Sequence, residues 1–181
     1  MRLTLVRHGR PLIDPSVRAA SWELAAGAVA EIRALPEPVG AWFSSPEPKA
    51  VATAHALTAT DVTVVPDLRE ARRRAVWFDD GEEFRRVVRR AFAHPEQAPA
   101  PGWEPLDCTR RRVGAAVRDL LARSAGDLVL VGHGTAWTLL VAELTGAEPD
   151  VDAWDRILMP DLAVLGVTTD GSGSLTRGWA C

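Results

Sequence analysis

The chain has 181 residues and a formal net charge of −3 at pH 7; charged residues make up 25% of it and hydrophobic residues 47%. These proportions are typical of a globular protein that buries a real core. The mild negative charge excludes the positive field that draws a protein to nucleic acid or acidic membranes, so we expect neither partner. Two cysteines are too few for a disulfide framework, which favours the reducing cytoplasm.

Short apolar runs alternate with helical patterns along the chain. In chain order we expect a strand at 3–6, a helix at 22–35, a strand at 41–43, a helix from Pro46 to 57, a strand at 62–65, a charged helix at 82–93, a helix at 106–124, a strand at 128–131, a helix from about 135 that ends at Gly146, and a strand at 162–167. This alternation predicts an α/β fold: a three-layer sandwich with a mainly parallel central sheet and helices on both faces. We expect one domain over 1–181, with a lid-like insertion at about 72–106.

Polar and charged residues follow four of the expected strands. They are Arg7-His8-Gly9-Arg10, then Ser44-Ser45-Pro46 with Lys49, then Glu70, and finally Gly132-His133-Gly134-Thr135. Parallel strands bring their carboxyl ends to one edge of a sheet, where open α/β proteins bind ligands. The excess of positive charge at this edge suits an anion, and the helix starting near Thr135 offers its N-terminal dipole to a phosphate. The sequence therefore predicts a phosphoryl-binding site.

The sequence resembles the histidine phosphatase superfamily, also called phosphoglycerate mutase-like, in four stretches: LVRHGRP, SSPEPKAVATA, LREARR and VGHGTAWTLLVAEL. The resemblance covers nearly the whole chain and implies a phosphoglycerate mutase-like fold. It implies a hydrolase for a small phosphorylated metabolite, in which His8 is the nucleophile that becomes phosphohistidine. It further implies that Arg7 and His133 bind the phosphate and that Glu70 donates a proton.

No metal or other cofactor is expected, because the protein supplies its own cations and the four histidines lack metal-ligand spacing. If protonated, His133 would stabilise charge on the phosphoryl oxygens. Lys49 adds a point charge at the position where the family usually has a second arginine. This difference leaves the geometry of the phosphate pocket open.

Two further departures from the family concern the choice of substrate. Arg10 stands where glutamate or glutamine is common, and ARRRAVWF replaces the usual stretch after Glu70. With Arg10, the arginines at 72–74 indicate that the rest of the substrate is polar or anionic. The expected substrate-binding residues are Gly9, Arg10, Asp14, Gly134 and Thr135.

Structural interpretations compete with the catalytic ones. Lys49 could be a surface lysine on a helix, and Glu70 could pair with one of the arginines at 72–74. The arginines at 110–112 are expected mostly at the surface, with room for one to reach the site. His8 and His133, each next to glycine after an apolar run, are harder to explain structurally.

Other functions also stay open. A mutase-type phosphoryl transferase must hold the phosphoryl group in a closed site, and the short insertion at 72–106 favours a phosphatase over it. A non-catalytic phosphate-binding pseudoenzyme is compatible with the loss of the second arginine. A serine hydrolase is disfavoured because the sequence has no G-x-S-x-G motif. The oligomeric state is left open.

Overall fold

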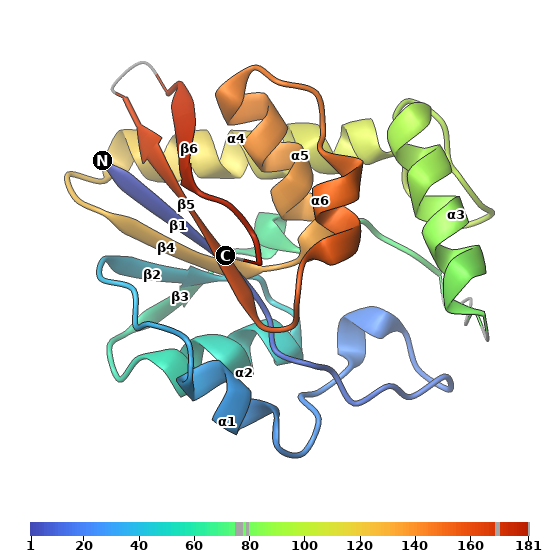
Figure 1. Ribbon diagram of the computed structural model, residues 1–181, viewed down its shortest axis with the longest axis horizontal. Helices are drawn as coiled ribbons and strands as arrows, with labels where there is room; N and C mark the ends of the chain where they lie inside the picture. The colour runs from blue at the N-terminus through green and yellow to red at the C-terminus, as the bar shows by residue number, and fades with distance from the viewer. Residues whose placement is uncertain (75–77, 79, 169–170, 181) are drawn as a thin grey trace.

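The computed structural model describes residues 1–74, 78, 80–168 and 171–180, and a six-stranded sheet forms its centre (Figure 1). Trp77 and Cys181 lie outside the described residues. The strands are β1 (Arg2–Arg7), β2 (Ala41–Ser44), β3 (Val62–Val64), β4 (Leu128–Gly132), β5 (Asp161–Val167) and β6 (Gly173–Arg177). They lie in the order β3-β2-β4-β1-β5-β6.

The first four strands are parallel, as predicted. β1 and β2 both pair with β4 in parallel, and β3 extends this set at the edge. The expectation that 162–167 joins the parallel strands was wrong, because β5 runs antiparallel to β1. β6 was not predicted: its sequence GSLTR is polar and lacks an apolar run, as an exposed edge strand can.

Helices cover both faces of the sheet, so the three-layer α/β architecture is confirmed (Figure 1). On one face α4 (Leu106–Arg123) and α5 (Gly134–Thr145) pack against leucines of β1 and β4. On the other, α1 (Ala28–Arg33) and α2 (Pro48–Leu57) pack against valines of the same strands. This two-sided burial explains why β4 reads as a continuous apolar run.

Two predicted helices differ in their bounds. The helix expected at 22–35 is only the six residues of α1, because Leu24 pairs with Pro11 in an isolated bridge and Gly27 turns the chain with a φ of 85°. α2 begins at Pro48 rather than Pro46, which leaves Glu47 extended before it. α5 ends, as expected, at a left-handed Gly146 with a φ of 68°.

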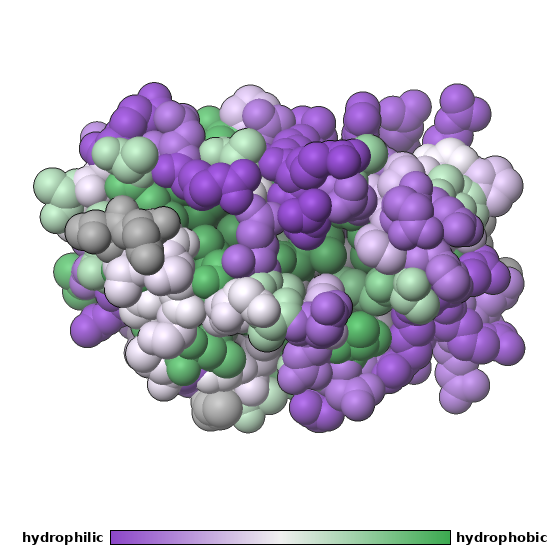
Figure 2. Space-filling model, turned by 90° about the horizontal axis from the view of Figure 1, so that it is seen from above, coloured by the Kyte–Doolittle hydropathy of each residue, from purple (hydrophilic) through white to green (hydrophobic). Residues whose placement is uncertain are grey.

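The described part of the segment at 72–106 lies beside the carboxyl ends of the strands (Figure 1). Its helix α3 (Gly81–Ala93) packs valines against Trp103 and Trp154, and Trp154 belongs to α6 (Val151–Arg156), a helix that was not predicted. Arg85 and Arg89 of α3 also pair with Asp155 of α6. Hydrophilic residues crowd this end of the molecule (Figure 2). Motion of this segment as a lid stays a prediction.

Two short 3-10 turns complete the described elements, η1 (Ala19–Ser21) and η2 (Pro66–Leu68). Both lie in loops that follow a strand at the carboxyl edge of the sheet. Within the described ranges, no helix is long and apolar enough to cross a membrane.

Candidate active site

His8 follows β1 and is buried at the carboxyl edge of the sheet. Its backbone N–H donates to the carbonyl of Gly132 in β4 at 3.0 Å. Its ring Nδ1 lies 2.7 Å from the carbonyl oxygen of Gly9, which can only accept, so Nδ1 carries the proton. Burial, assisted by the nearby His133, lowers the pKa of His8 well below its usual value of 6.5. The neutral ring therefore keeps an unprotonated Nε2, the form that a nucleophile requires.

His133 follows β4 and caps α5, with its ring in edge contact with that of His8 at a centroid distance of 5.1 Å. Its Nε2 lies 2.7 Å from Oγ of Ser45, a residue that the sequence analysis did not select. Burial lowers the pKa of His133 to about 3. The protonated form considered from the sequence is thus disfavoured in the site without a bound anion.

Arg7, the last residue of β1, directs its side chain toward the N-terminus of α5. Its Nη1 donates to the carbonyl of Ile157 at 2.5 Å, and its guanidinium lies over Gly134, where a Cβ atom would come within 3.4 Å. Its Nε is buried and has no hydrogen-bond partner among the described residues. Burial lowers the pKa of Arg7, against the opposing charge of Glu70, but an arginine remains protonated. A buried cationic N–H without a partner favours an anionic ligand.

Lys49 lies in the first turn of α2 and is buried, so the surface-lysine interpretation was wrong. Its Nζ donates to Oε2 of Glu47 at 2.5 Å and to the carbonyl of Ala19 at 2.7 Å. Glu47, which sequence reasoning missed, is also buried, and its Oε1 accepts the backbone N–H of Glu70 at 3.0 Å. The only sequence signal for Glu47 was its place between the SSP turn and Lys49. The Lys49 ammonium is therefore already paired with a carboxylate.

Glu70 follows η2 and is held by backbone N–H groups rather than by a surface arginine. Its carboxylate accepts from the N–H groups of Ala71 at 2.9 Å, Thr135 at 3.2 Å and Ala136 at 3.1 Å. The α5 N-terminus that was expected to receive a phosphate thus carries the Glu70 carboxylate, a favourable position for a negative charge. The alternative interpretation, in which Glu70 pairs with an arginine at 72–74, finds no such ion pair among the described residues.

Arg112 of α4 fixes the loop that carries Glu70. Its Nη1 donates to the carbonyls of Asp67 at 2.7 Å and Arg69 at 2.9 Å. Its Nη2 donates to Oε1 of Glu104 at 2.7 Å. Of the three neighbouring arginines, Arg112 is thus the one that reaches toward the site, where it acts as a positioning residue.

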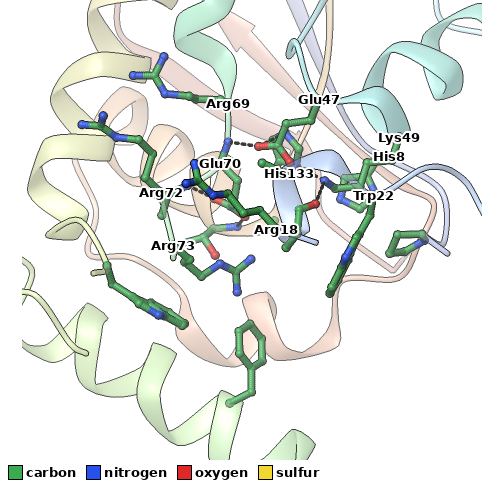
Figure 3. A pocket seen from close by; sticks show the side chains of 18 of the residues that line it. His8, Arg18, Trp22, Glu47, Lys49, Arg69, Glu70, Arg72, Arg73 and His133 are labelled. Atoms are coloured by element: carbon green, nitrogen blue, oxygen red, sulfur yellow. Dashed lines mark hydrogen bonds and ion pairs between the residues drawn. The ribbon is translucent and has the colours of Figure 1, made fainter. Parts of the chain in front are cut away.

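A cavity of about 870 Å³ joins these side chains (Figure 3). Its lining includes the expected residues Arg7, His8, Lys49, Glu70, His133, Gly134 and Thr135, together with the unexpected Glu47. Within the described part of the chain, no group of His, Cys, Asp or Glu comes together as a metal site.

Three expected substrate-binding residues lie outside the cavity lining, which corrects the sequence analysis. Arg10 points to the surface of α1 and pairs with Glu31 at 2.5 Å. The exposed Asp14 accepts the backbone N–H of Ser16 at 2.9 Å. Gly9 packs so closely against α1 that a Cβ atom there would come within 2.6 Å of a side-chain carbon. Gly9 therefore allows the loop to pack against α1, and its contact with a substrate stays a prediction.

Comparisons with known proteins identify the family and the fold of this chain. The family model described as histidine phosphatase superfamily (branch 1) matches residues 3–181. Among solved structures, a mycobacterial glucosyl-3-phosphoglycerate phosphatase has a TM-score of 0.77 and 20% identity over 99% of each chain. A phosphoserine phosphatase mutant from Entamoeba histolytica, solved with phosphoserine, has a TM-score of 0.72 and 15% identity over 99% of this chain and 96% of its own.

A putative α-ribazole-5′-P phosphatase from Escherichia coli has a TM-score of 0.71 and 19% identity over 99% of this chain and 96% of its own. No curated protein gives a significant sequence match. At these identities the structural matches establish the fold, and the phosphoglycerate mutase-like architecture predicted from the sequence is confirmed.

We predict that the free energy of unfolding decreases as the pH is lowered from about 6.5 toward 3. An unfolded histidine binds a proton near pH 6.5, whereas folded His133 binds it only near 3, and His8 also well below 6.5. Between these values the unfolded state holds more protons, so stability rises with pH by up to about 1.4 kcal/mol per pH unit for each histidine. Urea unfolding at a series of pH values measures this slope.

The matched variants for this measurement are His133→Asn and His55→Asn, since His55 is exposed. His133→Asn should reduce the slope by the contribution of one histidine, while His55→Asn should leave it unchanged. Equal slopes in wild type and His133→Asn would show that His133 is protonated in the folded protein.

We also predict opposite effects of the two members of the buried ion pair on the affinity for inorganic phosphate. Glu47→Gln keeps an oxygen for the Glu70 N–H but removes a negative charge, so the affinity should rise by about tenfold. Lys49→Met removes the cation and should lower the affinity by about 10- to 1,000-fold. Isothermal titration calorimetry measures both values, and unchanged affinity in Lys49→Met would remove Lys49 from the anion site.

Proposed function

This chain belongs to the histidine phosphatase superfamily, and we propose that it is a phosphomonoester hydrolase that forms a phosphohistidine on His8. The main support for this proposal is the tautomer and protonation of the His8 ring. Its Nδ1–H is held by the carbonyl of Gly9, and burial lowers its pKa, so the lone pair on Nε2 is available at neutral pH. A neutral imidazole can attack phosphorus and divide hydrolysis into two in-line steps.

The phosphoryl group would sit among groups that complement its charge. Arg7 can donate to two phosphoryl oxygens, and its buried Nε, unpartnered among the described residues, would gain an acceptor. Lys49 supplies a second positive charge, and the neutral ring of His133 lies beside His8. The hydrogen bonds of Arg7 and Lys49 hold these donors in place before a substrate binds. Donors that are already oriented toward the developing charge stabilise a transition state.

In the first step, the Nε2 lone pair attacks phosphorus while the bond from phosphorus to the substrate oxygen breaks. Glu70, which must enter this step as the carboxylic acid, gives its proton to the alkoxide and becomes a carboxylate. In the second step, a water oxygen attacks phosphorus, its proton passes to the Glu70 carboxylate, and the N–P bond breaks to release inorganic phosphate. We propose a small phosphorylated metabolite as the substrate and no metal in either step.

One observation favours a second candidate, a phosphate-binding protein without turnover: the Lys49 ammonium is already paired with Glu47. Incubation with p-nitrophenyl phosphate in the presence of EDTA separates the two candidates. The hydrolase should release p-nitrophenol, and the binding protein should not. A mutase would instead show little hydrolysis but move phosphate between positions on phosphoglycerate.

We predict that His8→Ala abolishes turnover of p-nitrophenyl phosphate while the circular dichroism spectrum is retained. Wild-type protein incubated with substrate and quenched should carry a phosphoryl group that is labile in acid and stable in base, and the variant should lack it. Exposed His55→Ala is the control and should behave as wild type. Wild-type turnover by His8→Ala would end the covalent hypothesis.

We predict that Glu70→Gln slows hydrolysis of alkyl phosphates far more than that of p-nitrophenyl phosphate. An alkoxide needs a proton in order to leave, whereas p-nitrophenolate does not, so a lost general acid costs about 100- to 10,000-fold only with the former. Comparing kcat for the two substrates measures the difference. An equal loss on both would assign Glu70 a structural role at the N-terminus of α5 and direct the search to another carboxylate.

A further inference from the structure

The cavity is larger than a phosphoryl group requires. Beyond the end that holds His8 and Glu70, its walls come from the loop after β1, from the segment after Glu70 and from α6. Among the described residues, five aromatic side chains line this outer part: Trp22, Phe78, Phe84, Trp103 and Trp154. The alcohol part of a substrate would therefore lie against an aromatic wall.

Arginines line the same outer part, and the structure distinguishes them by their partners. Arg72 pairs with Glu104 at 2.8 Å, and Arg69 with Asp67 at 3.5 Å. Arg18, Arg73 and Arg74 line the cavity, and none of the three has an ion pair to a described carboxylate. The side-chain carbons of Arg74 pack over Gly102, whereas the guanidinium of Arg73 lies among aromatic rings.

Aromatic rings fix the position of Arg73. Its guanidinium carbon lies 5.0 Å from the ring centre of Phe84 and 5.1 Å from that of Trp103. Such contacts orient the planar fork while leaving its N–H edge able to bind an anion. Because the group is already ordered, less conformational entropy is lost when an anion binds.

Arg18 approaches the same space from the other loop. It stands just before η1, whose Ala19 carbonyl accepts from Lys49, and both arginines project into the cavity that His8 and Glu70 face (Figure 3). The positive charge of Arg73 also contributes, after burial, to the lowered pKa values of His133 and Arg7. The charge of Arg73 therefore lies close enough to interact electrostatically with His133 and Arg7 at the phosphoryl end of the cavity.

We infer that Arg18 and Arg73 form a second anion subsite, so that the substrate is an organic phosphate whose alcohol part carries another anionic group. This inference rests on the proposed phosphatase function and names its substrate class. The first anion is the phosphoryl group at His8, and the second, a carboxylate or a phosphate, binds between the two arginines. The aromatic wall covers an apolar or planar segment between the two anions.

Two substrates that differ by one charge test the subsite. Benzyl phosphate and 4-carboxybenzyl phosphate share the same benzylic leaving oxygen, so the chemistry of the phosphoryl transfer is matched. We expect wild-type kcat/KM to be at least about tenfold higher for the carboxylated substrate. Arg18→Gln and Arg73→Gln should each remove most of this preference, and Arg73→Lys should restore part of it. Arg86→Gln, an exposed α3 position outside the cavity lining, should keep it.

The outcomes separate this inference from the proposed function. Turnover of benzyl phosphate with no preference for the carboxylate, or a preference that persists in both glutamine variants, would overturn the subsite and leave the phosphatase standing. If neither compound is hydrolysed, calorimetric binding of the same two compounds decides, and equal affinities would overturn the subsite. Arg18 is exposed, so its variant still gives the result if Arg73→Gln does not fold.

Discussion

The site depends on the parallel register of the three central strands. Arg7 lies opposite Gly132, and Ser44 opposite Val131, so β1, β2 and β4 end at one level. The ladder then continues one residue further, with His8 bonded to Gly132 and Ser45 to Val131. A slip of one residue in any strand would turn its side chains to the opposite face of the sheet. The apolar packing that fixes this register therefore also brings the two histidines into contact.

At this edge of the sheet, the buried positive charge of Lys49 is neutralised by the adjacent carboxylate of Glu47. The buried pair of Glu47 and Lys49 costs desolvation energy, and such pairs are poor sources of stability. Its value here lies in position: one carboxylate oxygen holds the ammonium, and the other holds the backbone of Glu70. The Lys49 ammonium and the backbone of Glu70 are thus joined through a single side chain, which accounts for the buried carboxylate of Glu47 beside the cation.

The central strands and the two histidines of the site could be predicted from the sequence, whereas β6 and the contacts of Arg10 and Arg112 could not. Continuous apolar runs mark β1, β2 and β4 because both faces of each strand are buried, whereas the polar β6 gives no such signal. His8 and His133 were recognisable because strand ends carry them. Arg10 was misassigned because the turn after Gly9 sends its side chain to Glu31, and this turn depends on packing against α1. The contacts of a residue distant in sequence, such as Arg112, could not be predicted because they form only when its helix packs against the sheet.

The contacts of Arg112 tie the reacting centre to an element that takes no part in the chemistry. α4 packs on one face of the sheet, yet its arginine holds the carbonyls at 67 and 69 and thereby the loop before Glu70. Arg112 lies in the second turn of α4, whose later residues Val113 and Val117 are fully buried in the main core cluster. Fraying of the first turns of α4 would release the loop before Glu70 while the rest of the helix stayed packed on the sheet. Such local opening, at a free energy below that of global unfolding, would displace the Glu70 carboxylate without melting the core.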